Sequence, residues 1–125
     1  MVGENILIVE DNTIQREGLA VVLRQHGFSV LLASDGQKAL ELSEQAVPDL
    51  ILLDMLIPDK DSDGWWFLKH RRRLSTLASV PVLITTALHI ASDEWAASLG
   101  AAGLIRKPFE VEPLVATIRQ FLGSA

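Results

Sequence analysis

The stretch Asp49-Leu50-Ile51-Leu52-Leu53-Asp54, which follows Pro48, decides the fold of this chain. Its four consecutive aliphatic residues show no polar alternation, which is typical of a central strand in a parallel sheet covered on both faces. The run ends at the carboxylate of Asp54. Because ligands of open α/β sheets bind beyond the carboxyl ends of the strands, Asp54 is the first candidate for chemistry. The alternative is an acid that only marks the return of the chain to solvent.

Short apolar runs and helical patterns alternate along the rest of the chain. Strands are predicted at 5–9, 28–33, 49–54, 80–85 and 103–106. Helices are predicted from a cap at Asn12 to a stop at Gly27, and over 37–45, 65–74, 92–99 and 111–122. Five strand-then-helix units with short joints predict an α/β fold, in which helices cover both faces of a parallel sheet.

Composition limits the remaining possibilities. A chain of 125 residues with 49% hydrophobic content suits one domain over residues 1–125. The net charge of −5 argues against nonspecific binding to nucleic acid. The lack of cysteine excludes disulfides and thiolate metal sites. No apolar stretch approaches the ~20 residues that span a bilayer, so we expect a soluble, cytoplasmic protein without membrane contact.

Polar side chains follow the predicted strands at the points where they end. Parallel strands bring their carboxyl ends to one edge of the sheet, so these side chains should converge. Three neighbouring acids repel one another unless a cation compensates, and Mg²⁺ held by oxygen ligands is the natural solution. A lysine opposite the acids makes sense if a second anion enters the site. The residues are Glu10, Asp11, Asp54, Thr85, Thr86 and Lys107.

Four motifs occur in order at these strand ends: Glu10-Asp11, Asp54, Thr86-Ala87 and Lys107-Pro108-Phe109. Each motif alone is common, but the ordered set resembles the receiver domain of bacterial two-component response regulators across essentially the whole chain. The resemblance implies a flavodoxin-like doubly wound sheet of five parallel strands in the order 2-1-3-4-5, with helices on both faces.

The resemblance also implies a phosphorylation switch. Asp54 would accept a phosphoryl group from a phosphohistidine of a histidine kinase or a phosphotransfer protein. Mg²⁺ would be held by Asp11, Asp54 and the backbone carbonyl of Leu56, while Glu10 would act mainly through a coordinated water. Such a domain promotes only its own phosphorylation and dephosphorylation, so it is not expected to be an enzyme acting on other substrates.

Two further roles and one peptide bond follow from the same resemblance. Lys107 would pair with one phosphoryl oxygen, and the Thr86 hydroxyl would move to donate a hydrogen bond to another. The Lys107–Pro108 bond is expected to be cis.

Two departures from the family pattern bear on switching. Leu104 stands where many receivers carry the Tyr or Phe that swings inward when the threonine moves, so signalling is not expected to follow that rotamer exchange. Leu56 and Leu88 occupy positions that tune the access of the hydrolytic water, and both are apolar. They predict slow autodephosphorylation.

The output of the switch is expected to be protein binding, through a downstream effector or an additional domain and with phosphorylation-dependent dimerisation, and without direct binding to nucleic acid. The alternative is a pseudo-receiver, an interaction module that works without phosphorylation. Trp66 should be at least partly exposed, because adjacent Trp65 can occupy the core. Trp66 and Trp95 are candidate interface anchors, or else rings that lie flat over aliphatic neighbours.

Two other patterns suggest additional sites. The segment Asp59-Lys60-Asp61-Ser62-Asp63-Gly64 matches the start of a Ca²⁺-binding loop, but His70 stands at the twelfth position in place of the bidentate glutamate. The run His70-Arg71-Arg72-Arg73 could contact nucleic acid. At helical spacing on an acidic domain, we interpret it as a solvated face.

Overall fold

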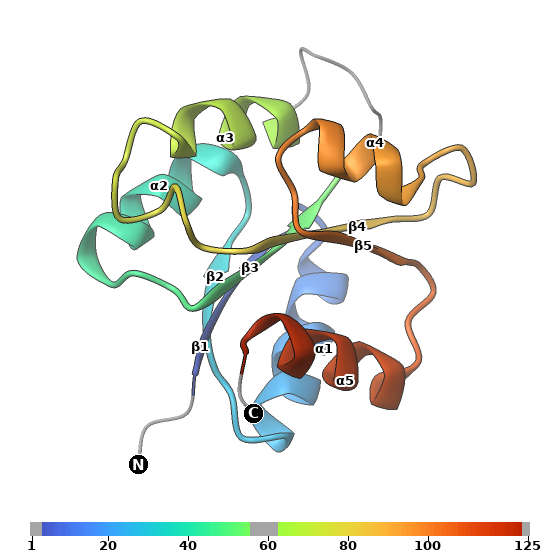
Figure 1. The fold of residues 1–125 in the computed structure, drawn as a ribbon. Helices are drawn as coiled ribbons and strands as arrows, with labels where there is room; N and C mark the ends of the chain where they lie inside the picture. Colours follow the sequence, from blue (N-terminus) through green and yellow to red (C-terminus); the bar gives the residue numbers. More distant parts are fainter. Residues whose placement is uncertain (1–3, 56–62, 124–125) are drawn as a thin grey trace.

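Five parallel strands form the centre of the protein. The computed structural model describes residues 4–55 and 63–123, with the Asp63 side chain left out. Within these residues one sheet has the order β2-β1-β3-β4-β5 (Figure 1), so the predicted flavodoxin-like order is confirmed. The strands are β1 (Asn5–Val9), β2 (Ser29–Ala33), β3 (Leu50–Asp54), β4 (Val82–Thr86) and β5 (Gly103–Arg106).

Helices lie on both faces of this sheet, as predicted. They are α1 (Thr13–Gln25), α2 (Gly36–Gln45), α3 (Asp63–Arg71), α4 (Asp93–Ser98) and α5 (Val111–Phe121). The helices α1 and α5 cover one face, and α2, α3 and α4 cover the other (Figure 1). None of the helices within the described ranges combines the length and apolar character that a bilayer span requires.

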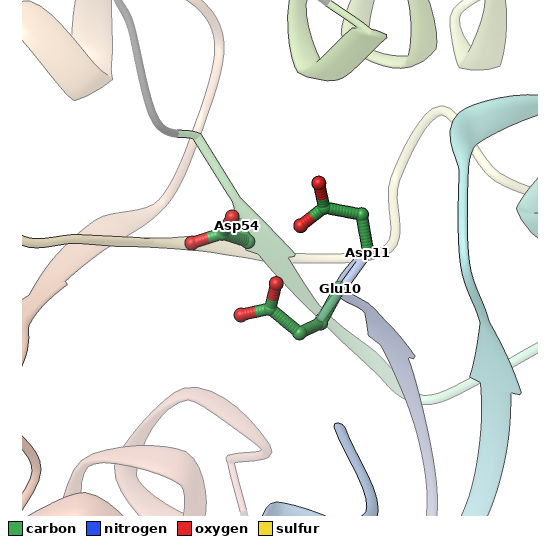
Figure 2. Close-up of side chains that lie close together, drawn as sticks. All are labelled: Glu10, Asp11 and Asp54. Carbon is green, nitrogen blue, oxygen red and sulfur yellow. The ribbon is translucent and has the colours of Figure 1, made fainter. Parts of the chain in front are cut away.

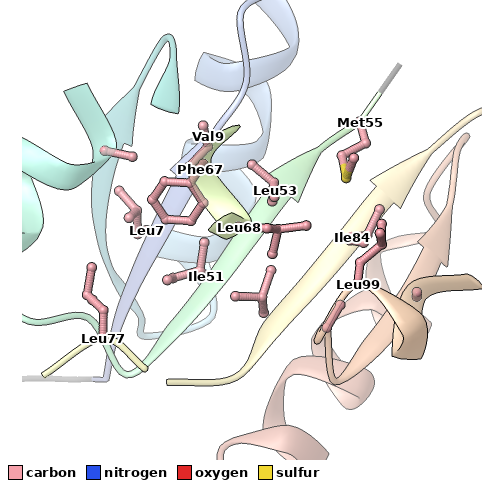
Figure 3. Close-up of a cluster of buried hydrophobic side chains, with 14 of the residues drawn as sticks. Leu7, Val9, Ile51, Leu53, Met55, Phe67, Leu68, Leu77, Ile84 and Leu99 are labelled. Atoms are coloured by element: carbon pink, nitrogen blue, oxygen red, sulfur yellow. The ribbon is translucent and has the colours of Figure 1, made fainter. Parts of the chain in front are cut away.

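The core alternates along each strand between the two faces. Leu7, Ile51 and Leu53 pack with Phe67 of α3 in the cluster beneath α2, α3 and α4 (Figure 3). Their immediate neighbours along the strands pack in a second cluster beneath α1 and α5. That cluster includes Ile6, Ile8, Leu50, Leu52 and Leu83. Because both faces of the sheet are buried, the central strands read as continuous aliphatic runs.

The joint between β1 and α1 fixes the chain next to the strand ends. The Asn12 side chain accepts a hydrogen bond from the Gln15 backbone N–H at 2.9 Å, which confirms the predicted cap. The helix ends before Gly27, whose φ of 89° is the left-handed conformation that glycine adopts without strain. Asp11 therefore lies between a buried strand and a capped helix.

Strand β4 begins later than predicted. The Val80 backbone N–H donates to the Leu77 carbonyl in a turn, and Pro81 has no N–H to donate. The regular strand therefore starts at Val82 and extends through Thr86, one residue beyond the predicted end.

The interpretation of 70–73 as a solvated face is wrong for Arg71, which is only 4% exposed. Its Nη1 donates to three carbonyls of the loop before β4, and its Nη2 donates to the Gly100 carbonyl at 3.1 Å. The three carbonyls belong to Leu77, Ala78 and Val80, at 2.8, 3.3 and 3.2 Å. Burial, and secondarily the charge of Arg72, lowers the pKa of Arg71. The pattern missed this arginine because it packs beneath the loop that follows its helix.

Arg72 and Arg73 are exposed, as the sequence predicted. Arg72 also donates to the Leu99 carbonyl at 2.8 Å, where α4 ends. Its guanidinium occupies the space in which a Cβ at Gly100 would lie, and Gly100 has a φ of 84°. A side chain at this position would therefore strain the backbone and displace the end of the flexible Arg72 side chain.

The tryptophans lie at the border of the core. Trp66 is half-buried, which agrees with the predicted partial exposure, and its ring stacks on His70 with the centroids 4.2 Å apart. Trp65 and Trp95 are also half-buried, and all three rings pack against the cluster beneath α2, α3 and α4. Both adjacent tryptophans of α3 therefore lie at the edge of the core, and Trp65 is only partly buried.

Candidate functional site

Three carboxylates meet at the carboxyl edge of the sheet. Glu10 and Asp11 directly follow β1, and Asp54 is the last residue of β3 (Figure 2). One ligand oxygen from each residue lies within 4.8 Å of those of the other two. Glu10 is buried, Asp54 is half-buried and Asp11 is exposed. The tertiary structure thus brings together the three acids that the strand-end pattern singled out.

Lys107 pairs directly with two of these acids. Its Nζ lies 2.6 Å from Oδ1 of Asp54 and 2.8 Å from Oε1 of Glu10. The side chain of Lys107 is only 16% exposed, that of Asp54 9% and that of Glu10 7%. A third hydrogen bond joins Nζ to Oε1 of Gln15 at 2.8 Å. All three N–H donors of the ammonium are therefore used.

Burial and neighbouring charges shift the pKa values of Glu10 and Lys107. Burial raises the pKa of Glu10 and outweighs the lowering by the hydrogen bonds from Lys107 and the Asn12 backbone. Burial on its own would lower the pKa of Lys107. Its hydrogen bonds to Asp54 and Glu10 and the charges of these acids reverse the effect and raise that pKa. The lysine therefore remains a cation at neutral pH.

Neighbouring groups hold Glu10 in place. Its Oε2 accepts a hydrogen bond from the Asn12 backbone N–H at 3.1 Å, and its carbonyl accepts one from Nη1 of Arg16 at 2.8 Å. The start of α1 therefore fixes the backbone and the side chain of Glu10 at the edge of the sheet.

The acid cluster has the chemistry of a site for a hard divalent cation. Carboxylate oxygens are the ligands that Mg²⁺ prefers, and Glu10, Asp11 and Asp54 offer three of them within a few ångströms. The residues present therefore fit Mg²⁺. The predicted backbone ligand at Leu56 lies outside the described part of the chain and remains a prediction. Residues 59–62 of the partial Ca²⁺-loop pattern also lie outside it, and α3 begins at Asp63, where such a loop would continue.

Thr86 ends β4 but does not join the acid cluster. It is only 1% exposed, and its Oγ1 accepts a hydrogen bond from the Leu88 backbone N–H at 3.1 Å. No hydrogen bond between described residues links Thr86 to Asp54. Thr85 is the residue that pairs with Asp54 in the sheet register. The contact with the Leu88 N–H uses only an oxygen lone pair of Thr86, so the O–H of this hydroxyl can still donate.

Arg106 ties the loop after β4 to the edge strand β5. Its Nη1 donates to the Leu88 carbonyl at 2.8 Å, and its Nη2 donates to the carbonyl of Ala91. Leu104, the predicted switch position, is half-buried against the cluster beneath α2, α3 and α4. The Lys107–Pro108 peptide bond is cis.

No sequence pattern predicts the contacts of Arg106 and Gln15. Arg106 is an exposed polar residue at the end of an edge strand, and such residues are common. In the sequence, Gln15 is only the residue three positions after the predicted cap at Asn12. Its contact with Lys107 spans 92 positions, so no local pattern contains it.

Comparisons with known proteins agree with this fold. The response regulator receiver domain model matches residues 6–119. The phosphate regulon transcriptional regulatory protein PhoB of Escherichia coli (strain K12) is 37% identical over 118 residues, which cover 94% of this chain and 51% of that protein. The chain spans about half the length of the curated relatives it matches.

Solved structures give the same result. The chemotaxis protein CheY4 of Vibrio cholerae aligns with a TM-score of 0.84 and 30% identity over 95% of this chain and 98% of its own. The receiver domain of sensor histidine kinase PA1611 from Pseudomonas aeruginosa PAO1 aligns with a TM-score of 0.84 and 29% identity, over 98% of this chain and 99% of its own. That structure has a magnesium ion coordinated in its active-site cleft.

A doubly wound parallel sheet with acids and a lysine at its carboxyl edge defines the class of CheY-like flavodoxin folds. Within this class, the chain belongs to the response regulator receiver domain family. Receiver domains are signalling domains of two-component systems, in which they act between histidine kinases and effector domains.

Proposed function

We propose that this domain accepts a phosphoryl group on Asp54 from a phosphohistidine of a histidine kinase or a phosphotransfer protein. A carboxylate oxygen of Asp54 attacks the phosphorus, a P–O bond forms and the P–N bond breaks. The leaving imidazole nitrogen keeps the electron pair of that bond and is protonated. The observation that carries the proposal is the pairing of Lys107 with Asp54 at 2.6 Å, beside two further acids.

The residues of the site have different roles in the proposed phosphoryl transfer. Lys107 is a half-buried cation that can pair with a phosphoryl oxygen once it releases a carboxylate. Thr86 can donate its O–H to a second oxygen once the hydroxyl moves toward Asp54, because its contact with the Leu88 N–H uses only an oxygen lone pair. Glu10, Asp11 and Asp54 would hold Mg²⁺, which when bound neutralises the negative charge that gathers around the transferring group. Glu10 and Asp11 would otherwise repel that group.

Incubation with Mg²⁺ and acetyl phosphate, followed by intact-mass measurement, tests the proposal. The wild type should gain the mass of one phosphoryl group, and the Asp54→Asn variant should gain none, because an amide cannot form the acyl phosphate. Asp93→Asn is the matched control, because Asp93 lies on the exposed first turn of α4. A phosphoryl group that still attaches to Asp54→Asn would contradict the assignment.

The alternative of a pseudo-receiver has its own outcome in this experiment. A wild type that gains no mass from acetyl phosphate, and none from a phosphorylated phosphotransfer domain, would favour an interaction module that works without phosphorylation. The three acids, and the lysine that pairs with Glu10 and Asp54, support the phosphoaccepting function over this alternative.

The phosphoryl group on Asp54 should be lost slowly. Leu88 is apolar and half-buried, and its backbone is held by Thr86 and Arg106, so it offers no polar group to orient an attacking water. The mass of purified phosphoprotein, followed over time after removal of the donor, measures the lifetime. Leu88→Gln supplies such a polar group and should shorten it. A wild-type lifetime of seconds would contradict the prediction.

The domain's output is proposed to be binding to a protein effector or to an additional domain, with dimerisation on phosphorylation. This chain matches about half the length of PhoB, and PhoB is named a transcriptional regulatory protein. The expectation that this chain itself does not contact nucleic acid therefore stays a prediction. We also propose that the domain catalyses no reaction other than its own phosphorylation and dephosphorylation.

A further inference from the structure

Gln15 accepts a hydrogen bond from Lys107 and has no role in the phosphoryl transfer proposed above. Its side chain lies on the first turn of α1 and reaches Lys107, with 2.8 Å between Oε1 and Nζ. An ammonium has no acceptor, so the amide oxygen must be the atom that faces it. The amide nitrogen of Gln15 therefore points away from Lys107 and cannot replace the oxygen in this contact.

The three residues that accept hydrogen bonds from Lys107, namely Glu10, Gln15 and Asp54, have different roles in the proposed reaction. Asp54 must become the acyl phosphate, and Glu10 belongs to the acid cluster that would face a cation. Gln15 is neutral, lies on α1 and has neither task. Its hydrogen bond is therefore the one that Lys107 can keep while its bonds to the two carboxylates change.

The surroundings of Gln15 suit a fixed anchor. Its backbone N–H is held by the Asn12 side chain at 2.9 Å, and the next residue, Arg16, donates to the Glu10 carbonyl. Gln15 and Lys107 also line the same cavity of about 560 Å³ between α1 and α5. The first turn of α1 is thus tied to the acid site, while the side chain of Gln15 itself is exposed.

We propose that Gln15 is a positioning residue. Its hydrogen bond holds the Lys107 ammonium next to Asp54, where the ammonium can contact the phosphoryl group. This inference rests on the proposed phosphoacceptor function. It assigns Gln15 no direct contact with the reacting atoms. Gln15 acts by keeping Lys107 in place when a carboxylate partner is lost.

Two variants of nearly the same length separate the anchor from simple packing. Gln15→Met keeps the size of the side chain and removes the oxygen acceptor, whereas Gln15→Glu keeps an acceptor at that point. Because Gln15 is exposed, both variants should fold, and each should still show one cooperative unfolding transition. Differences at Lys107 would then report the hydrogen bond and not the fold.

The first readout is the NMR signal of the Lys107 ammonium. The chain has four lysines, Lys38, Lys60, Lys69 and Lys107, and the spectrum of Lys107→Met assigns the signal. A buried ammonium with three hydrogen bonds should exchange its protons slowly and give a resolved signal. We expect faster exchange or loss of that signal in Gln15→Met, and a retained signal in Gln15→Glu. This readout needs neither phosphorylation nor bound metal.

The second readout is the rate of phosphorylation by acetyl phosphate at saturating Mg²⁺. Gln15→Met should react about tenfold more slowly than the wild type, the effect of losing one hydrogen bond to a charged group. Gln15→Glu should react faster than Gln15→Met. Both readouts must change for the proposal to hold. An unchanged Lys107 signal or an unchanged rate in Gln15→Met would overturn it.

Failure of the proposed function would look different from failure of this inference. A wild type that takes up no phosphoryl group would overturn the phosphoacceptor function, and the positioning role with it, even with a well-resolved Lys107 signal. A wild type that is phosphorylated normally, with Gln15→Met identical to it in signal and rate, would overturn only the role of Gln15.

Discussion

Replacing Arg71 by methionine is expected to lower the free energy of unfolding by about 3 kcal/mol. The guanidinium donates to carbonyls of Leu77, Ala78, Val80 and Gly100, and the residue is only 4% exposed. Methionine fills much of the volume but donates no hydrogen bond, so the buried Leu77 bond and three part-buried ones would be lost. Removal of a buried charge offsets part of this cost, which is why we expect a loss smaller than four full hydrogen bonds.

Urea denaturation of the wild type and the variant measures this loss, with an unchanged slope as evidence that both unfold from the same compact state. Arg73→Met is the matched control, because Arg73 is exposed and lies two residues further along. The control should change stability by about 0.5 kcal/mol or less. Equal stabilities of Arg71→Met and Arg73→Met would show that the buried guanidinium contributes nothing.

Replacing Lys107 by methionine is also expected to destabilise the protein by about 3 kcal/mol at neutral pH without Mg²⁺. The buried Glu10 and the half-buried Asp54 would then be neighbouring carboxylates without their cation. The pKa of Glu10 is already raised by burial, and Lys107 is a cause that lowers it, so this pKa should rise further in the variant. A raised folded-state pKa favours the protonated folded form. The deficit should therefore be small at acid pH and grow as the pH rises through the pKa of Glu10.

Mg²⁺ should restore much of this loss. In the variant no ammonium occupies the carboxylate oxygens, so the cation should bind more tightly than in the wild type. A ligand at a hundred times its dissociation constant stabilises a protein by about 2.7 kcal/mol. Urea denaturation with and without Mg²⁺, at two pH values, measures both effects. Lys38→Met, at an exposed position of α2, is the control. An equal gain from Mg²⁺ in wild type and Lys107→Met would contradict competition between Lys107 and the metal.

The fold could be predicted from the sequence because its signals are local. The continuous aliphatic run 50–53 is a consequence of burial on both faces, and the alternation of strands with helices leaves few ways to build a parallel sheet. The predicted boundary of β4 was less accurate, because it depends on a turn at Leu77 and on where Pro81 falls. Such details are set by hydrogen bonds outside the strand.

The acids and the lysine of the site could be predicted for the same reason. Parallel strands all end at one edge, so residues that directly follow them converge whatever the details of packing. The sequence therefore determined that Glu10, Asp11, Asp54 and Lys107 lie together.

Only the tertiary structure decided how the remaining side chains are used. Arg71 belongs to a basic run that is typical of a solvated face, but the loop before β4 folds over it and supplies its acceptors. Gln15 and Arg106 are exposed polar residues whose partners lie far away in the sequence. Periodicity and strand ends specify where the backbone goes, whereas a hydrogen bond between distant side chains depends on the three-dimensional positions of both partners. That is the physical reason why the sequence determined the acid site and only the folded chain revealed what holds Lys107 within it.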